Sequence, residues 1–131
     1  MKKINKIYLI ALVLFLALSV FLLVQNKVKT IDYKVAGQSF KLLVADSTDE
    51  WVNGLMNVRE LKNADGMMFV FPDKKRRTFW NKNTYLDLYV YWILNDEVVG
   101  RDFLPSIEKS KRIVYVSSPV PVDKVAEIIR K

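Results

Sequence analysis

The stretch DLYVYWIL, residues 87–94, sets the fold class of this chain. Aromatic and aliphatic side chains alternate along it, which is typical of a β-strand whose two faces have different surroundings. Asn95-Asp96 follows at once and favours the two-residue turn of a β-hairpin. We therefore predict that residues 97–104 form a second strand and pair with 87–94 in an antiparallel hairpin.

Two more strand regions precede this hairpin. In residues 31–45, apolar and polar side chains alternate on either side of Gly37, which predicts another hairpin. Residues 66–71, GMMFVF, form a continuous apolar run that is typical of a strand buried on both faces, and Pro72 is expected to end it. Residues 77–80 are then expected to return beside that strand.

One short helix is predicted between the strand regions. Ser47 is followed three residues later by Glu50, the pattern of a capping box, so a helix is expected to start at Thr48. Residues 112–116 indicate a strand, whereas 122–130 fit helical and strand periodicity equally well. These elements predict a mainly antiparallel β domain with about seven strands and one short helix, closed into a small barrel or sandwich.

The N-terminal region has a different composition from the rest. Residues 7–24, IYLIALVLFLALSVFLLV, carry no charge and are long enough to span a bilayer as a helix. Lysines at positions 2, 3 and 6 favour a cytoplasmic N-terminus. We therefore expect residues 1–26 to form a cytoplasmic stub and membrane anchor, and residues 27–131 to form an extracytoplasmic domain. A cleaved signal peptide, which would leave the domain secreted, is the alternative.

The composition also limits the chemistry. The 131 residues include no histidine and no cysteine, which removes histidine-based catalytic triads, CxxC redox pairs and the common zinc sites. The four glycines are dispersed at positions 37, 54, 66 and 100, so the chain has no glycine-rich phosphate loop. We expect neither a metal nor a cofactor.

The basic residues include one dense run, KKRR at residues 74–77. A solvated turn is its simplest interpretation, and contact with anionic lipid headgroups near the anchor is the alternative. The whole chain has 21 basic and 14 acidic residues, for a formal net charge of +7. Nucleic acid is not an expected partner, because the domain is predicted to lie outside the cytoplasm.

Three motifs resemble those of a known family. GLMNVREL (54–61), GMMFVF (66–71) and FWNKNT (79–84) occur in the order and at the spacing found in the UPF0127 family, also called DUF192. Members are small extracytoplasmic proteins of unassigned biochemical role. The resemblance is good over residues 38–104 and weaker beyond. There, the match of residues 125–127 to a Val-Leu-Glu strand of the family favours a strand.

The FWNKNT motif is the candidate functional site. In a structural interpretation, Trp80 is a core anchor, Asn83 and Thr84 supply turn hydrogen bonds, and Arg59 and Lys82 are surface charges. In a functional interpretation, Trp80 is the stacking wall of a pocket, and Asn83 and Thr84 are its hydrogen-bonding groups. Lys82 or Arg59 would then hold an anionic or polyhydroxylated ligand. Position 81 departs from the family, because Asn81 stands where the family usually has methionine.

We predict a membrane-tethered extracytoplasmic binding or accessory domain for a small polar ligand or an envelope component. One alternative is a hydrolase that uses two carboxylates or a Ser–Lys pair, and another is a structural protein-interaction module of the cell envelope. No residue pattern marks a catalytic pair. The hydrolase candidates are Asp49, Glu50, Asp87, Asp96, Asp102 and the Ser110-Lys111 pair.

Overall fold

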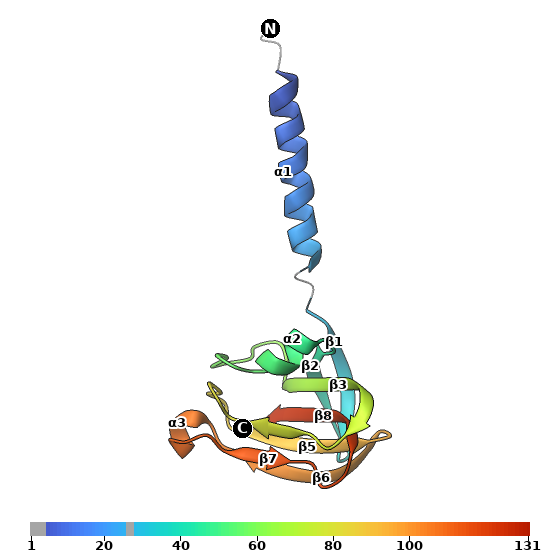
Figure 1. Cartoon of the computed structure of the whole chain (residues 1–131), viewed down its shortest axis with the longest axis vertical. Helices are drawn as coiled ribbons and strands as arrows, with labels where there is room; N and C mark the ends of the chain where they lie inside the picture. Colours follow the sequence, from blue (N-terminus) through green and yellow to red (C-terminus); the bar gives the residue numbers. More distant parts are fainter. Residues whose placement is uncertain (1–4, 26–27) are drawn as a thin grey trace.

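The structure, a computed structural model, describes residues 5–25 and 28–131 and consists of an N-terminal helix followed by a β domain (Figure 1). The elements in chain order are α1 (Lys6–Gln25), β1 (Thr30–Val35), β2 (Gln38–Ala45), α2 (Thr48–Asn53), β3 (Gly66–Lys75), β4 (Thr78–Trp80), β5 (Leu88–Leu94), β6 (Glu97–Leu104), α3 (Ile107–Ser110), β7 (Tyr115–Ser117) and β8 (Val122–Ile129). Six strands form one sheet in the order β1-β2-β3-β8-β5-β6, and β4 and β7 form a separate ladder.

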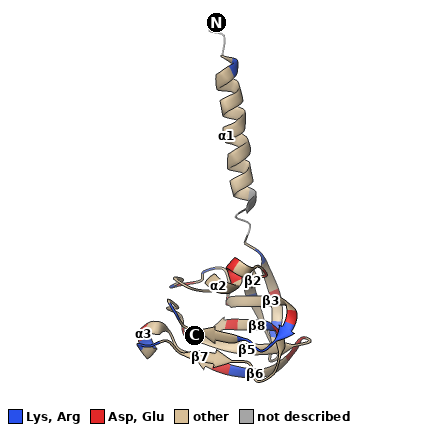
Figure 2. Cartoon of the chain, viewed as in Figure 1, with Lys and Arg blue, Asp and Glu red and all other residues tan. Residues whose placement is uncertain are grey.

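Helix α1 contains the apolar span expected from the sequence. It is long and apolar enough to cross a membrane, and none of that stretch is buried against the rest of the chain. Figure 2 shows the part of the helix that it colours as uncharged beyond its first residue, Lys6. The helix therefore fits a membrane anchor or a signal sequence by length and composition.

The local predictions for the hairpins and the first short helix are confirmed. β1 and β2 pair antiparallel on either side of Ala36-Gly37, and β5 and β6 pair on either side of Asn95-Asp96. Both residues of the second turn have positive φ, as a type I′ hairpin turn requires. The Ser47 side chain caps α2 by accepting a hydrogen bond from the backbone N–H of Glu50.

Two predictions about β3 and β4 are wrong. β3 continues past Pro72 to Lys75, with an irregular register in its last part. β4 pairs antiparallel with β7 instead of returning beside β3. The physical reason is that both edges of β3 are already occupied: β2 pairs with it in parallel on one side, and β8 pairs with it antiparallel on the other.

The C-terminal half also differs from expectation in detail. Residues 122–129, which were ambiguous by periodicity, form β8 in the middle of the sheet, between β3 and β5. Helix α3, which lies between β6 and β7 and is capped by the Ser106 side chain, was not predicted from the sequence. The strand expected over 112–116 is shorter and shifted, since β7 covers Tyr115–Ser117.

The predicted closure into a barrel or sandwich is not confirmed, because the six-stranded sheet ends at β1 on one side and β6 on the other. The sheet is nevertheless strongly curved, and β1 runs across the ends of its neighbours in Figure 1. The Tyr33 hydroxyl donates a hydrogen bond of 2.7 Å to Asp96 in the β5–β6 turn, and the Lys124 ammonium group lies 3.0 Å from the same carboxylate. Side chains thus join the two ends of the sheet without a backbone ladder.

The two faces of the curved sheet bury separate sets of side chains. We call the face that carries Phe69, Trp92 and Val125 the covered face, because α2, β4 and β7 pack over it. Phe79 of β4 lies edge-on to two of its aromatic rings, with centroids 4.9 Å from Phe69 and 5.7 Å from Trp92. We call the other face the concave face; its buried residues are Val35, Leu42, Met68, Ile93, Ala126 and Ile128.

Candidate functional site

The three sequence motifs meet in one small pocket on the covered face. The first motif contributes Gly54, Leu55 and Met56, the second contributes Phe69, and the third contributes Phe79, Trp80 and Thr84. Helix α2 adds Trp51, Val52 and Asn53, and β8 adds Glu127. We call this cavity of about 30 Å³ the motif pocket.

Glu127 is the unusual residue of the motif pocket. It lies on β8 between Val90 of β5 and Met67 of β3, and only 5% of its surface is exposed. Among the described residues, no donor forms a hydrogen bond with its carboxyl group, and its oxygens are open to the motif pocket instead of being fully enclosed. Burial raises the pKa of this carboxyl to about 8, so at neutral pH it is largely protonated.

Two glycines permit the close packing around this carboxyl. A side chain at Gly66 on β3 would collide with the backbone carbonyl of Glu127 on β8. Gly54 ends α2 at φ +46°, a conformation that other residues adopt with strain, and a Cβ there would lie 3.1 Å from the Phe69 ring. Each of these two motif glycines therefore allows a backbone approach that shapes the pocket.

Trp51 is a fixed wall of the motif pocket. Its indole N–H lies 3.1 Å from the carbonyl oxygens of both Ala45 and Val70 and donates to them. The ring also packs against Phe71, with centroids 5.1 Å apart. Because these contacts tie α2 to β2 and β3, the wall is held in place by the sheet itself.

Trp80 lies at the rim of the pocket, so its structural interpretation as a core anchor is wrong. Its side chain is 39% exposed, and the neighbouring Phe79 fills the core position instead. The Lys82 ammonium group lies 5.2 Å from the centroid of the Trp80 ring. Tyr115 of β7 is the cross-strand neighbour of Trp80, with its ring centroid 6.1 Å away. The exposed ring is thus available to a ligand only where these neighbours leave it uncovered.

Asn81 is a structural residue with no part in the pocket lining. It is fully buried, and its side-chain amide donates to the carbonyl of Pro105 at 2.9 Å and to the Ser110 hydroxyl at 2.8 Å. Its side-chain oxygen accepts from the backbone N–H of Val114 at 2.8 Å. The polar side chain that departs from the family therefore joins the third motif to the segment around α3.

The other candidate residues divide between the pocket and the surface. Thr84 is buried and lines the pocket, with its hydroxyl 3.2 Å from the carbonyl of Lys82. Asn83 is exposed in a turn at φ +51°, where its carbonyl accepts from the N–H of Asn57. Arg59 lies 3.9 Å from the centroid of the Tyr85 ring and forms an exposed ion pair with Glu108. The structure thus brings Trp80 and Thr84 together and places Lys82, Asn83 and Arg59 outside the lining.

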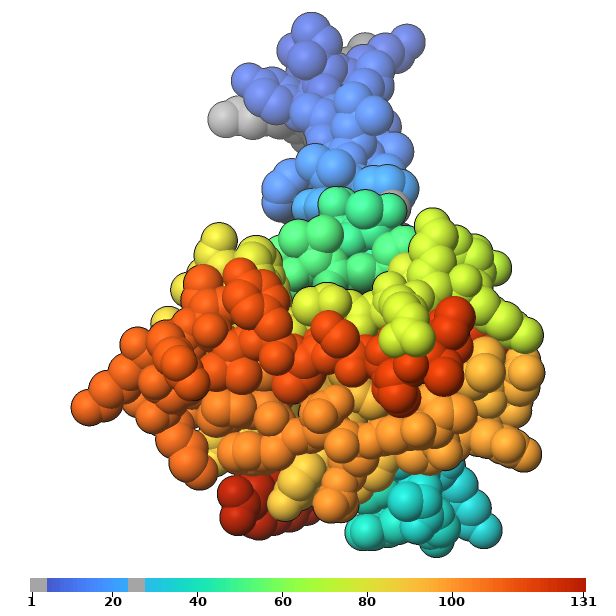
Figure 3. Space-filling model, turned by 60° about the horizontal axis from the view of Figure 1, so that its bottom comes forward, coloured from blue at the N-terminus to red at the C-terminus, as the bar shows by residue number. Residues whose placement is uncertain are grey.

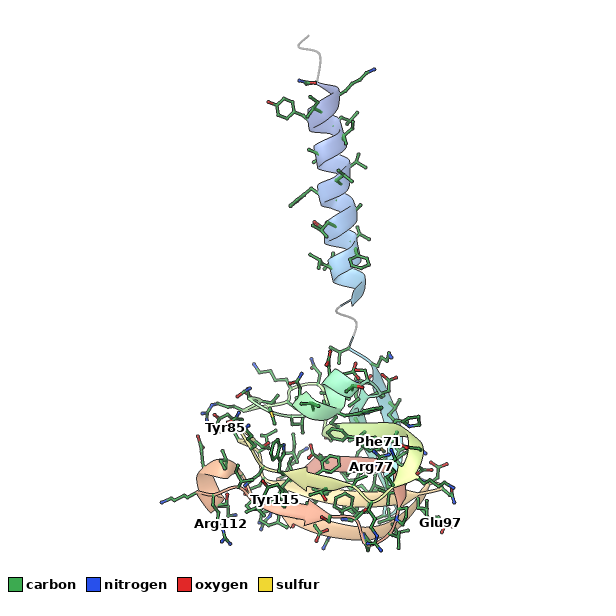
Figure 4. All side chains as sticks on the ribbon, in the orientation of Figure 1. Phe71, Arg77, Tyr85, Glu97, Arg112 and Tyr115 are labelled. Carbon is green, nitrogen blue, oxygen red and sulfur yellow. The ribbon has the colours of Figure 1, made fainter. Side chains whose placement is uncertain are left out.

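A wider groove of about 370 Å³ adjoins the motif pocket and shares Trp51, Val52, Phe79 and Trp80 with it. The end of the basic run, Arg76-Arg77, lines its outer side. Arg77 stacks on Phe71, as Figure 4 shows, and forms a 2.6 Å ion pair with Asp73. Hydrogen bonds from Lys75 and Arg77 hold the pKa of the Asp73 carboxyl below its usual range. The basic run is therefore partly neutralised within β3 and its turn.

Most of the residues considered for a hydrolase have structural partners. The Asp87 carboxylate accepts the backbone N–H of Ser106, which lowers its pKa, and pairs with Lys109. Asp102 accepts the indole N–H of Trp92 at 2.6 Å, and the Glu50 carboxylate caps the N–H of Asp46. The Ser110 hydroxyl lies 2.7 Å from the carbonyl of Arg112 and donates to it, and it accepts from Asn81.

Sequence reasoning missed Glu127 as a site residue. The signal was present, because in residues 125–129, VAEII, the glutamate occupies an inward position of an otherwise apolar strand. Only the structure shows that this position faces the three motifs.

The three motifs that meet in the motif pocket agree with the assignment of the chain to a family. The model of the DUF192 family, described as an uncharacterized ACR, matches residues 29–130, so the chain belongs to this family. No curated protein matches the chain significantly. A crystal structure of a putative transcription regulator from Sinorhizobium meliloti 1021 is 27% identical, with a TM-score of 0.59 over 76% of this chain and 78% of that one. A protein of unknown function from Novosphingobium aromaticivorans DSM 12444 shares the fold at 20% identity, with a TM-score of 0.58 over 79% and 83%.

Proposed function

We propose that this chain is a membrane-anchored extracytoplasmic domain that binds a small polar ligand in the motif pocket. Glu127 carries the proposal. A carboxyl group that loses most of its solvation and has no hydrogen-bond donor from the protein is costly to the fold, and this one is open to the motif pocket, where a ligand can pair with it. Its place beside all three family motifs makes ligand binding the explanation that fits best.

The shape of the pocket limits what enters it. A cavity of about 30 Å³ admits only a small polar group, such as a hydroxyl or an amine. The protonated Glu127 carboxyl donates a hydrogen bond to an oxygen of that group, and the Thr84 hydroxyl provides a second contact. The remainder of the ligand lies in the adjoining groove against Trp51 and Trp80.

A binding function fits the pocket better than glycoside hydrolysis. The usual glycosidase mechanism needs two carboxyl groups that flank the scissile bond, and Glu127 is the one carboxyl group among the residues that line the motif pocket. The description of the Sinorhizobium protein as a putative transcription regulator does not fit the proposed location of this chain, because an extracytoplasmic domain is separated from DNA.

The location is supported by α1 and by the short connection that follows it. α1 offers an uncovered apolar surface, and lysines at positions 2, 3 and 6 favour a cytoplasmic N-terminus. β1 starts at Thr30, six positions after residue 24, which limits the separation of the two to about 20 Å. An anchored domain would therefore stay close to the membrane surface.

The ligand proposal is tested by thermal shift of the full chain in non-ionic detergent, against sugars, amino acids, amines and peptidoglycan fragments. A ligand at a hundred times its dissociation constant stabilises by about 2.7 kcal/mol, which raises the melting temperature by several degrees. We expect the shift to disappear in Glu127→Leu and to persist in Lys82→Gln, a control outside the lining. A shift that survives in Glu127→Leu would place the ligand elsewhere, and the absence of any shift would contradict the proposal.

The location is tested separately by labelling. Because the chain has no cysteine, Lys111→Cys introduces a single exposed thiol at the end of α3. We expect a membrane-impermeant maleimide to label this thiol in intact cells, with the protein in the membrane fraction at full mass. Labelling only after lysis would place the domain in the cytoplasm, and a shorter secreted product would indicate a cleaved signal peptide.

A further inference from the structure

A second cavity, of about 400 Å³, lies on the concave face at the far side of the sheet from the motif pocket. We call it the concave trough. Figure 3 shows the segments around it side by side: the β1–β2 hairpin in turquoise, the yellow-to-orange residues of β5, and the C-terminal residues in dark red. Its lining includes Gln38, Phe40, Tyr89, Tyr91, Ile128 and Arg130.

Aromatic rings and arginines alternate at the border of this trough. The Arg101 guanidinium lies 4.9 Å from the ring centroid of Tyr89 and 5.9 Å from that of Tyr91. The Arg130 guanidinium lies 5.2 Å from the centroid of Phe103, whose ring packs on Tyr89 at 5.8 Å. Stacking on a ring orients a guanidinium while leaving its N–H donors free at the edge.

Among the residues that the structure describes, these two arginines form no direct ion pair, although the charge of Arg130 also acts on the Asp87 carboxylate and helps to lower its pKa. Within residues 5–25 and 28–131, neither Arg101 nor Arg130 has an acidic partner within 4 Å. By contrast, the Lys131 ammonium group lies 3.7 Å from Asp65, the one acidic side chain in the lining. The trough therefore combines aromatic walls with one arginine in its lining, Arg130, and a second, Arg101, stacked on the lining rings Tyr89 and Tyr91.

We propose that the concave trough binds a sugar unit that carries an anionic group, a carboxylate or a phosphate, as part of an envelope polymer. The volume lies in the range of small-molecule sites. The C–H face of a sugar ring packs by dispersion on Tyr89 and Tyr91, while Gln38 and Ser39 supply partners for hydroxyl groups. The anion pairs with the guanidinium of Arg101 or Arg130, which form strong, directional hydrogen bonds with carboxylates and phosphates. A polymer as occupant rests on the extracytoplasmic location proposed above.

The test uses the full chain in non-ionic detergent and isothermal titration with trigalacturonic acid, glucose 1-phosphate and a neutral dextran trimer. We expect an anionic sugar to bind and the neutral trimer to bind at least tenfold more weakly. The double variant Arg101→Gln/Arg130→Gln should lose at least tenfold in affinity. The matched control Lys111→Gln/Arg112→Gln removes the same charge outside the trough and should stay within twofold. Both pairs are exposed, and Arg130→Gln alone provides a second, milder variant.

Three results would overturn the proposal. The first is equal affinity for neutral and anionic sugars, or no binding of either anionic sugar at millimolar concentration. The second is unchanged affinity in the double variant. The third is tighter binding of an oligothymidylate than of either anionic sugar through the same two arginines, which would assign the trough to nucleic acid. The motif pocket is not altered by these variants, so failure here leaves the ligand proposal for Glu127 intact.

Discussion

The covered face and the concave face of the same sheet handle charge in opposite ways. On the covered face, a carboxyl group is enclosed under α2 and β4 and loses its solvation, which raises its pKa. On the concave face, arginines stay exposed and rest on half-buried aromatic rings. We therefore expect pH to control the stability that the covered face contributes. Ionic strength should instead control the affinity of binding at the concave face.

The largest expected effect comes from Glu127→Gln. Burial raises the pKa of the Glu127 carboxyl from its ordinary value of 4.5 to about 8, so the folded state accommodates its protonated form. The contribution of Glu127 to stability is therefore fully present below pH 4.5, is lost as the pH rises to about 8, and is constant above that. At pH 9 the glutamine variant should be more stable by about 3–5 kcal/mol, and at pH 4 it should equal the parent.

Urea unfolding followed by tryptophan fluorescence between pH 4 and 9 measures this effect. Glu60→Gln is the matched control, since Glu60 is exposed. Parallel pH profiles for the parent and Glu127→Gln would show that the enclosed carboxyl does not titrate differently from an exposed one, and the contrast between the two faces would fail.

Asn81→Ala should give the next largest effect, because it removes the hydrogen bonds that join the end of β4 to the segment around α3, over the covered face. The change leaves the buried N–H of Val114 and the carbonyl of Pro105 without their partner and should lower the free energy of unfolding by about 2–3 kcal/mol. Asn83→Gly is the control, since glycine tolerates the positive φ of that exposed turn. An equal loss of unfolding free energy in both variants would mean that the buried Asn81 amide does not hold β4 to the segment around α3.

Tyr33→Phe tests the side-chain link that joins the two ends of the sheet around the concave face. Loss of the hydroxyl that donates to Asp96 should lower the free energy of unfolding by about 1 kcal/mol. Burial and that hydrogen bond raise the pKa of Tyr33, so its absorbance titration should begin at higher pH than that of exposed tyrosines. Tyr85→Phe is the control, and an equal effect of the two changes on stability would argue against the link.

Lys82→Gln should have the smallest effect. The ammonium group lies over an exposed Trp80 ring, where a cation–π contact contributes only about 0.5–1 kcal/mol. We expect a small change in the urea midpoint and a measurable change in Trp80 fluorescence. A loss larger than that of Tyr33→Phe would mean that the rim of the motif pocket is more tightly held than its exposure indicates.

The parts of the fold that were predictable are those set by near neighbours in the sequence. Asn95-Asp96 forms its turn through the backbone preferences of those two residues, and Ser47 caps α2 through a bond to a residue three positions away. The partner of β4 depends instead on which strand edges remain free after β2 and β8 have paired with β3. That competition between distant segments has no local signature.

The candidate site also combines residues that a local motif indicates with residues that only the tertiary structure brings in. The FWNKNT motif suggested four neighbouring binding residues. Trp80 and Thr84 line the cavity, whereas Lys82 and Asn83 belong to a turn outside its lining. Trp80 is not the core anchor of the structural interpretation, because alternation along β4 sends Phe79 inward and Trp80 outward. Glu127 comes from a strand more than forty residues away, and its importance arises only from what it faces.

The central position of β8 has a consequence for how the domain acquires its shape. Residues 30–75 and 88–104 each form local pairs, yet they meet across β8, which is made later than either of them. Until residues 122–129 arrive, two small sheets with open edges coexist without a shared core, and neither is expected to be stable alone. A chain in that condition stays loosely structured while it is being made. The shared core of the domain is therefore complete only after the last strand has been inserted.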